Sequence, residues 1–244
     1  MNLLRLGIDI GGTSIKGALV GNVVGHPVTD VMRIEAKAPY DPEVGIAAIN
    51  EIGNKIGWTP SIGIGFPGVV SGTTVRTAPN LGDEWEDFDF SELIENNDAV
   101  EEVTLINDAD AAACAEMEFG AGKDEEGTVL LITIGTGLGT AIFRNGVLVP
   151  NLELGLMRWD GEQAVEHFAS SRVKDEEDLD WEEWSSRFQS VLEHYEMLLS
   201  PDVIILGGGF IHTSRHWWDS LTTQAELHKA SLGNEAGIVG AALS

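Results

Sequence analysis

The sequence predicts an α/β protein built from two lobes. A strand, a glycine-rich turn and a second strand open the chain at residues 4–20, and the same pattern returns at residues 128–143. Each opening leads toward segments with helical spacing of apolar residues, and no short spacing recurs several times as it would in a solenoid. We therefore expect a first lobe over residues 1–106, a second lobe over 107–244, and a last helix, about 234–244, that packs back on the first lobe.

The composition indicates a folded and strongly acidic protein. Hydrophobic residues make up 43% of the 244 positions, which is enough for a sizeable buried core. Acidic residues outnumber basic ones 40 to 14, so the formal net charge is -26 and a basic nucleic-acid-binding surface is not expected. Because like charges on one body repel, we expect added salt to favour folding; equally, the charge could serve solubility alone.

The cysteine content and the first residues bear on the compartment. The single cysteine, Cys114, allows neither an intramolecular disulfide nor a cysteine-rich zinc site, which fits a reducing cytoplasm. Residues 1–5 lack the pattern of a signal peptide, and no apolar run is long enough to cross a bilayer. We therefore expect a cytoplasmic protein with neither a membrane nor a nucleic-acid partner.

Apolar periodicity predicts the elements of the first lobe. Short apolar runs predict a small hairpin at residues 69–75 and strands at 4–10, 15–20, 28–34, 61–66 and 103–106. Apolar residues at helical spacing predict a helix at 42–56, and Ser91 is expected to cap a short helix at 91–97. An alanine-rich run predicts a further helix at 109–119.

The second lobe shows the same mixture of signals. Apolar runs predict strands at residues 128–133, 140–143, 147–149 and 203–206. Asn145-Gly146 is the typical two-residue turn of a β-hairpin and joins the second and third of these strands. Helical spacing predicts helices at residues 162–173, 181–199 and 234–243.

Three glycine turns follow strands, at residues 11–14, 135–139 and 207–209. Glycine lets backbone N–H groups approach phosphate oxygens, and Lys16 adds positive charge near the first turn. The spacing matches neither the dinucleotide-binding fingerprint nor the Walker A loop. One such turn could be a plain hairpin, but three at different strand ends indicate a phosphate site, because open α/β sheets bind ligands at their strand ends.

Four polar residues near these strand ends are candidates for chemistry. Asp9 precedes the first glycines and could either hold Mg²⁺ through water or cap the turn. Asp108 could be the N-cap of the helix at 109–119, a general base toward an alcohol, or both, while Asn107 holds a neighbouring hydroxyl. Glu153 is a single acid among apolar residues, so it is either a surface residue or a buried acceptor for a hydroxyl.

In combination, these motifs resemble the ROK sugar kinases. The stretches that carry the resemblance are residues 7–13 with Lys16, Gly65-Phe66-Pro67-Gly68, residues 107–112, and the two later glycine turns. Within the family, further stretches look like polyphosphate/ATP glucokinases, namely residues 75–80, 119–123, 145–146, 181–184 and 236–242. The similarity extends over nearly the whole chain.

The resemblance implies two ribonuclease-H-like lobes of the actin-like ATPase type around a central cleft. It implies transfer of a terminal phosphoryl group from polyphosphate or ATP to the 6-hydroxyl of a hexose, with Mg²⁺, without zinc, in a homodimer. Asp108 would be the catalytic base, and the sugar would contact Gly68, Asn80, Asn107 and Glu153. The phosphates would contact Gly11, Gly12, Thr13, Lys16, Thr136, Gly137, Gly207 and Gly208, and Asp9 would hold Mg²⁺ through water.

Two departures from the family pattern affect these expectations. The family follows its sugar-binding Glu with Gly-His, whereas this chain has Leu156 in place of the histidine and Arg158 where close relatives have an acid. A different sugar, or a protein that binds sugar or nucleotide with weak or no catalysis, is therefore the alternative. The acidity of the chain also disfavours a long polyanion such as polyphosphate, which makes ATP a competing donor.

Overall fold

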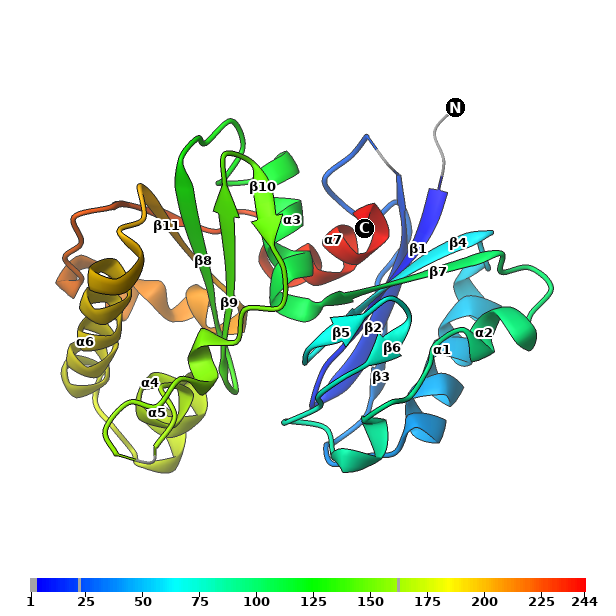
Figure 1. The fold of residues 1–244 in the computed structure, drawn as a ribbon, viewed down its shortest axis with the longest axis horizontal. Coiled ribbons are helices and arrows are strands. Elements are labelled where there is room, and N and C mark those ends of the chain that lie inside the picture. The colour runs from blue at the N-terminus through cyan, green and yellow to red at the C-terminus, as the bar shows by residue number, and fades with distance from the viewer. Residues whose placement is uncertain (1–3, 22, 162) are drawn as a thin grey trace. The chain divides into compact units, whose positions relative to one another are not determined.

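The structure is a computed structural model that describes residues 4–21, 23–161 and 163–244. It contains two five-stranded mixed sheets, and the strands of both sheets follow the same arrangement (Figure 1). The first sheet has the order β3-β2-β1-β4-β7, and its strands are Met32–Glu35, Ser14–Gly21, Leu4–Ile10, Ser61–Phe66 and Glu102–Asn107. The second has the order β10-β9-β8-β11-β12, and its strands are Val147–Val149, Leu138–Arg144, Thr128–Ile134, Val203–Gly207 and Glu226–Lys229. In both sheets the first three strands are antiparallel and the last two run parallel to the central strand.

The chain divides into two compact units. Unit 1 comprises Met1–Gly120 with Glu235–Ser244, and unit 2 comprises Ala121–Asn234. The division falls after Gly120 rather than near Asn107, because helix α3 (Asp108–Phe119) packs against the last helix, α7 (Ala236–Leu243). These two helices are so close that a side chain on Gly240 would overlap the carbonyl of Ala111.

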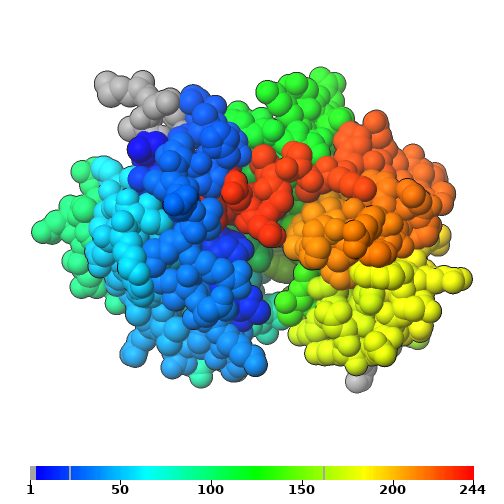
Figure 2. All heavy atoms as spheres, turned by 180° about the vertical axis from the view of Figure 1, so that it is seen from behind, coloured from blue at the N-terminus to red at the C-terminus, as the bar shows by residue number. Residues whose placement is uncertain are grey.

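Helices α1 (Pro42–Ile56) and α7 cover opposite faces of the first sheet. Side chains alternate between faces along a strand, so Gly7 and Ile8 face opposite ways. A side chain on Gly7 would meet Ile238 of α7, whereas Gly17, which pairs with Ile8, lies against Ile52 of α1. Helix α7 thus packs on the sheet of unit 1, and Figure 2 shows its atoms in red beside the blue atoms of the first residues of that unit.

The core of unit 2 forms between its sheet and helix α6 (Trp181–Leu199). Apolar residues of α6 at helical spacing, among them Trp184, Phe188 and Tyr195, are fully buried against Ile132 and Ile204 of the sheet. The side chain of Asp180 caps this helix by accepting a hydrogen bond of 2.8 Å from the N–H of Glu183. None of the described helices is long and apolar enough to span a membrane.

Most of the predicted elements are confirmed, including α1 and α6 with their expected bounds. The hairpin at 69–75 is present as β5 (Val70–Ser71) and β6 (Thr74–Val75). At the Asn145-Gly146 turn both residues have positive φ, 52° and 74°, as a type I′ turn requires. Strand β12 (Glu226–Lys229) was not predicted, because its Glu-Leu-His-Lys sequence is mostly polar and carries no apolar run.

Four expected elements differ in detail. The strand expected at 28–34 is β3, Met32–Glu35. The helix expected at 91–97 is only α2 (Glu92–Glu95), and Ser91 does not cap it because its own backbone, at φ -57° and ψ -21°, is already helical. The helix expected at 162–173 is split, and α7 begins at Ala236.

The split lies at Ser170, where the backbone is extended. Helices α4 (Glu166–Ala169) and α5 (Ser171–Glu176) flank this residue, whose ψ is 169°. The carbonyls of Ala169 and Ser170 there accept hydrogen bonds from Trp184 Nε1, both of 3.1 Å, so the core holds the chain out of the helical conformation. Glu162, where the predicted helix begins, lies outside the described residues.

Candidate active site

The carboxyl end of β1 places Asp9 opposite Lys16 on β2. Their carboxylate Oδ2 and ammonium Nζ atoms are 3.0 Å apart, and the side chains are 18% and 24% exposed. The backbone of Gly237 in the first turn of α7 comes so close that a Cβ atom there would lie 3.0 Å from Cγ of Asp9. The carboxylate of Asp9 therefore lies beside both the ammonium of Lys16 and the N-terminal turn of α7.

The first glycine turn directs its carbonyl groups toward one segment of chain. The carbonyl of Gly11 accepts a hydrogen bond of 2.9 Å from the hydroxyl of Tyr40, and the carbonyl of Gly12 accepts one of 2.7 Å from the N–H of Ala38. The carbonyl of Thr13 accepts one of 3.2 Å from the N–H of Ala36. No described residue accepts a hydrogen bond from the N–H groups of Gly12 and Thr13. Both N–H groups are therefore open to an acceptor from outside the described chain.

Asn107 and Asp108 connect β7 to α3. Asn107, which is 3% exposed, is the N-cap: its Oδ1 accepts hydrogen bonds from the N–H groups of Ala109, at 2.9 Å, and Asp110, at 3.0 Å. The capping role that we considered for Asp108 is therefore wrong. Asp108 is the first residue of the helix and is half-buried, and its Oδ1 accepts a hydrogen bond of 2.8 Å from Ala109.

Gly68 and Asn80 belong to the same unit. The carbonyl of Gly68 accepts a hydrogen bond of 3.1 Å from Nδ2 of Asn107, which ties the loop after β4 to the start of α3. A side chain at Gly68 would overlap the carbonyl of Thr77 at 2.0 Å, so only glycine fits there. Asn80 is exposed, and its carbonyl lies 3.9 Å from where Cβ of a residue at Gly12 would be. The structure thus brings Asn80 to the first glycine turn and Gly68 to Asn107.

The pairing of the strands sets the spacing of these groups. Asp9 pairs with Gly65 on β4, and Gly65 pairs with Ile106, the residue before Asn107, on β7. The three strands are parallel, so their carboxyl ends lie at one edge of the sheet. Neighbouring strands are about 4.8 Å apart, which puts Asp9 and the end of β7 on the order of 10 Å from each other.

In unit 2, the glycine turns at 135–139 and 207–209 are neighbours. Gly207 pairs with Thr133, and a side chain on Gly208 would overlap the backbone of Ile134, immediately before the first of these turns. Gly208 has φ of 80°, which other residues rarely adopt. No described residue accepts a hydrogen bond from the N–H groups of Thr136 and Gly137, so these too are open to an acceptor from outside the described chain.

Glu153 lies beside the turn at 135–139. It precedes the short 3-10 helix Leu154–Leu156, in which Gly155 packs against the carbonyl of Leu138 so closely that a Cβ atom would lie 2.0 Å from it. Glu153 is half-buried, whereas Leu156 is 38% exposed. The N–H of Leu156 donates a hydrogen bond of 3.1 Å to the carbonyl of Glu153, so the backbone forms this turn irrespective of the side chain at 156.

Three residues that support the glycine turns were not predicted from the sequence. Tyr40 binds the carbonyl of Gly11, and the backbone N–H and the hydroxyl of Ser171 both bind the carbonyl of Gly135, at 3.0 and 2.6 Å. The carboxylate of Glu166, which is 5% exposed, lies where a side chain on Gly137 would be and accepts a hydrogen bond of 3.4 Å from Leu138. Nothing in their local sequence marks them, because each contacts a turn that is distant along the chain.

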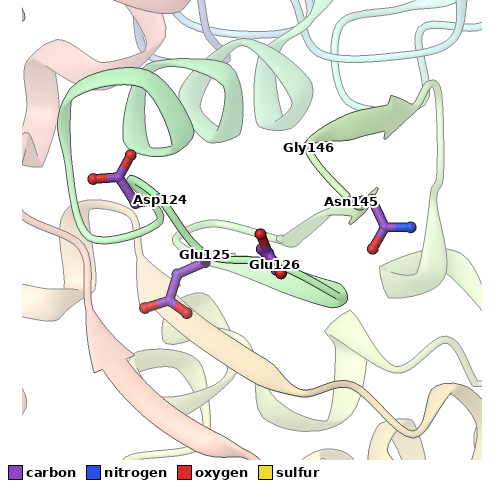
Figure 3. A pocket seen from close by; sticks show the side chains of 5 residues that line it. All are labelled: Asp124, Glu125, Glu126, Asn145 and Gly146. Atoms are coloured by element: carbon purple, nitrogen blue, oxygen red, sulfur yellow. The ribbon is translucent and has the colours of Figure 1, made fainter.

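A surface hollow of ≈ 480 Å³ in unit 2 contains none of the predicted site residues. Figure 3 shows its lining side chains: Asp124, Glu125 and Glu126, which precede β8, and Asn145 with Gly146 at the turn between β9 and β10. Three carboxylates at one place repel a phosphate chain, so this hollow is not the donor site.

Comparisons with known proteins agree on one family. The model of the ROK family matches residues 5–150. A polyphosphate glucokinase of Mycobacterium leprae (strain TN) is 40% identical over 238 residues, which are 98% of this chain and 73% of that protein. A polyphosphate glucokinase of Mycobacterium tuberculosis (strain CDC 1551 / Oshkosh) is 38% identical over 98% of this chain and 89% of its own length.

A solved structure is also similar over the whole chain. The inorganic polyphosphate/ATP-glucomannokinase of Arthrobacter sp. strain KM superposes with a TM-score of 0.92 at 37% sequence identity, covering 99% of this chain and 98% of that chain.

Proposed function

The chain belongs to the ROK family, and we propose from this premise that it is a hexose kinase of the polyphosphate/ATP glucokinase type. It transfers the terminal phosphoryl group of polyphosphate or ATP to the 6-hydroxyl of a hexose, with glucose as the first candidate. Its α/β class and its two ribonuclease-H-like lobes are those of the family, since the fold matches the glucomannokinase over 99% of the chain.

The arrangement of Asn107 and Asp108 carries this proposal. The side chain of Asn107 caps α3 and donates a hydrogen bond to the carbonyl of Gly68, and so fixes the direction in which the chain enters the helix. Asp108 follows as a half-buried carboxylate at the first helical position. In this proposal it accepts the proton of the 6-hydroxyl while that oxygen forms a bond to the terminal phosphorus and the bond from phosphorus to the donor's bridging oxygen breaks.

The backbone donors of the two turns would bind the donor phosphates. Gly12 and Thr13 in unit 1 and Thr136 and Gly137 in unit 2 have N–H groups without an acceptor among the described residues. Phosphoryl transfer requires mainly positioning and charge stabilisation, which fixed N–H groups and the ammonium of Lys16 supply. Gly207 and Gly208 would support the same phosphates from the neighbouring strand end.

Mg²⁺ is part of the proposal through Asp9. Mg²⁺ favours oxygen ligands and often binds one carboxylate together with substrate phosphates and water. Asp9 fits this pattern because its carboxylate, 18% exposed, lies beside the first phosphate turn. The ion would neutralise charge on the phosphates. We also propose a cytoplasmic homodimer, for which light scattering of the purified protein is the test of the oligomeric state.

A coupled assay tests the reaction directly. Glucose, mannose and other hexoses are supplied with either polyphosphate or ATP, and release of the sugar phosphate is followed. We expect Asp108→Asn to lower kcat by at least about 10²-fold, which is the rate acceleration that a general base usually contributes, and to leave the circular dichroism spectrum unchanged. Asp98→Asn, which alters an exposed carboxylate in the same unit, is the matched control. Equal turnover in the two variants would remove Asp108 from its role.

Leu156 favours a second candidate function. With an alkyl group at this 38% exposed position, the chain lacks the imidazole expected from the family pattern, so it could select another hexose or bind sugar without catalysis. Calorimetry that detects sugar binding without product formation would support the binding protein. The exposed position tolerates a larger side chain, so Leu156→His should fold and should tighten hexose binding. Unchanged affinity for every hexose would show that position 156 does not contact the sugar.

A further inference from the structure

The two phosphate turns share a feature that their sequences do not reveal. In each turn the carbonyl of the first glycine accepts a hydrogen bond from a side-chain hydroxyl of a distant segment. Tyr40 Oη is 2.9 Å from the carbonyl oxygen of Gly11, 29 positions away, and Ser171 Oγ is 2.6 Å from that of Gly135, 36 positions away. The same contact thus occurs once in each unit.

These hydrogen bonds determine where the following N–H group points. A trans peptide is planar, and its carbonyl and N–H groups point in opposite directions. When Tyr40 holds the carbonyl of Gly11, the N–H of Gly12 must point away from Tyr40; likewise, the N–H of Thr136 must point away from Ser171. Since no described residue accepts a hydrogen bond from either N–H group, both stay directed at a position where an anion can bind.

The Tyr40 hydroxyl is itself held in place. The residue is 8% exposed, its ring packs edge-on against Trp85 with the ring centroids 6.0 Å apart, and its carbonyl accepts a hydrogen bond of 2.7 Å from Trp85 Nε1. Burial and the negative charge of Asp9 raise the pKa of Tyr40, so the hydroxyl stays protonated and able to donate. Trp85 is fully buried, and the core of unit 1 thereby fixes the first turn.

Ser171 is held by its place in the chain. It is the first residue of α5, directly after the extended Ser170, and its backbone N–H donates to the same carbonyl of Gly135 at 3.0 Å. Two donors from one residue leave the carbonyl of Gly135 little freedom to turn. The split between α4 and α5 therefore serves the second turn, because an unbroken helix would retain the N–H of Ser171 for itself.

We propose that Tyr40 and Ser171 are positioning residues that orient the two phosphate turns and so set the affinity for the phosphoryl donor. The proposal rests on the proposed function, since it assumes that these turns bind the donor. It assigns neither residue a contact with the reacting atoms.

The test removes each hydroxyl alone. A hydrogen bond of this kind contributes roughly a two- to tenfold effect, so Tyr40→Phe and Ser171→Ala should each raise the KM for donor by about that factor while the KM for hexose is unchanged. The double variant should show the product of the two factors. Ser171→Thr keeps a hydroxyl and should restore most of the loss.

The chain provides a matched control for each variant. The hydroxyls of Tyr195 and Ser170 are buried and have no hydrogen-bond partner among the described residues. Tyr195→Phe and Ser170→Ala therefore remove the same groups from buried positions where they donate to neither turn, and the KM for donor should not change. A rise in the KM for donor in these controls equal to that in the test variants would overturn the proposal.

Direct binding separates this proposal from the proposed function. Inorganic tripolyphosphate and a non-hydrolysable ATP analogue are titrated by calorimetry into the wild type and the variants. Wild-type protein that binds a probe but phosphorylates no hexose would refute the kinase assignment; weaker binding by Tyr40→Phe and Ser171→Ala would then still support the positioning role. Equal affinity in wild type and both variants, or no binding of either probe by the wild type, would overturn it.

Discussion

Asn107→Ala tests whether a single buried amide holds the start of α3 and the loop of Gly68 together. The change removes both capping hydrogen bonds, of 2.9 and 3.0 Å, and the bond of 3.1 Å to Gly68. Loss of an N-cap costs about 0.5–2 kcal/mol. The buried carbonyl of Gly68 loses a partner, which costs about 1–3 kcal/mol. Together the free energy of unfolding should fall by about 1.5–5 kcal/mol.

Asn107→Ser separates the two contributions. Serine still caps the helix, but it cannot reach Gly68, so its cost should be about 1–3 kcal/mol and smaller than that of alanine. The assay is urea unfolding followed by circular dichroism, in which a lower midpoint at constant slope reports stability. Asn96→Ala is the control, because this exposed amide makes one hydrogen bond, to Glu92, and its loss should stay within about 0.5 kcal/mol. Equal midpoints for the serine and alanine variants, or an alanine variant as stable as the control, would refute the reasoning.

Three further predictions concern stability. Gly63→Ala should cost about 3 kcal/mol or more in chemical unfolding, because its Cβ would lie 1.7 Å from the carbonyl oxygen of Ala241 and the backbone would have to move. The hydrogen bond to Glu226 raises the pKa of His228. The stability that protonated His228 contributes is therefore complete below its unfolded pKa of about 6.5, and it is lost as pH rises through the higher folded pKa. We expect His228→Gln to lower the melting temperature slightly at pH 5.5 and to leave it unchanged at pH 9. Because the chain has a net charge of -26, its melting temperature should rise when NaCl is increased from about 0.05 to about 0.5 M, which is roughly one-third to three times the physiological ionic strength. A melting temperature that does not depend on salt would contradict this prediction.

The elements that could be predicted are those determined by residues close together in the sequence. Helix α1 shows helical spacing of apolar residues over its whole length, and the Asn145-Gly146 turn has residue types that adopt its backbone conformation easily. Edge strand β12 and the split at Ser170 could not be predicted, because pairing with β11 and a hydrogen bond from Trp184 decide them. Those contacts are tertiary, and no window of neighbouring residues contains them.

The candidate site divides in the same way. The glycine turns were found because each lies directly after a strand and depends on residues next to one another. The hydroxyls that hold them were not found, because Tyr40 and Ser171 are 29 and 36 positions from the carbonyls that they bind. A tyrosine before a helix and a serine at a helix start have many ordinary roles, so only the three-dimensional contact distinguishes these two.

The shift of the cap from Asp108 to Asn107 matters for the chemistry. Had Asp108 been the N-cap, its carboxylate would have bound the N–H groups of the first helical turn, which are the donors that a cap satisfies. The neutral amide of Asn107 binds those of Ala109 and Asp110 inside a buried environment, and Oδ1 of Asp108 also accepts a hydrogen bond of 2.8 Å from Ala109. Asn107 thus takes both capping hydrogen bonds, and the N–H of Asp110 does not need a carboxylate as its acceptor. For the base proposed at Asp108 this matters, because each N–H group that a carboxylate binds makes it a weaker acceptor for the proton of an alcohol.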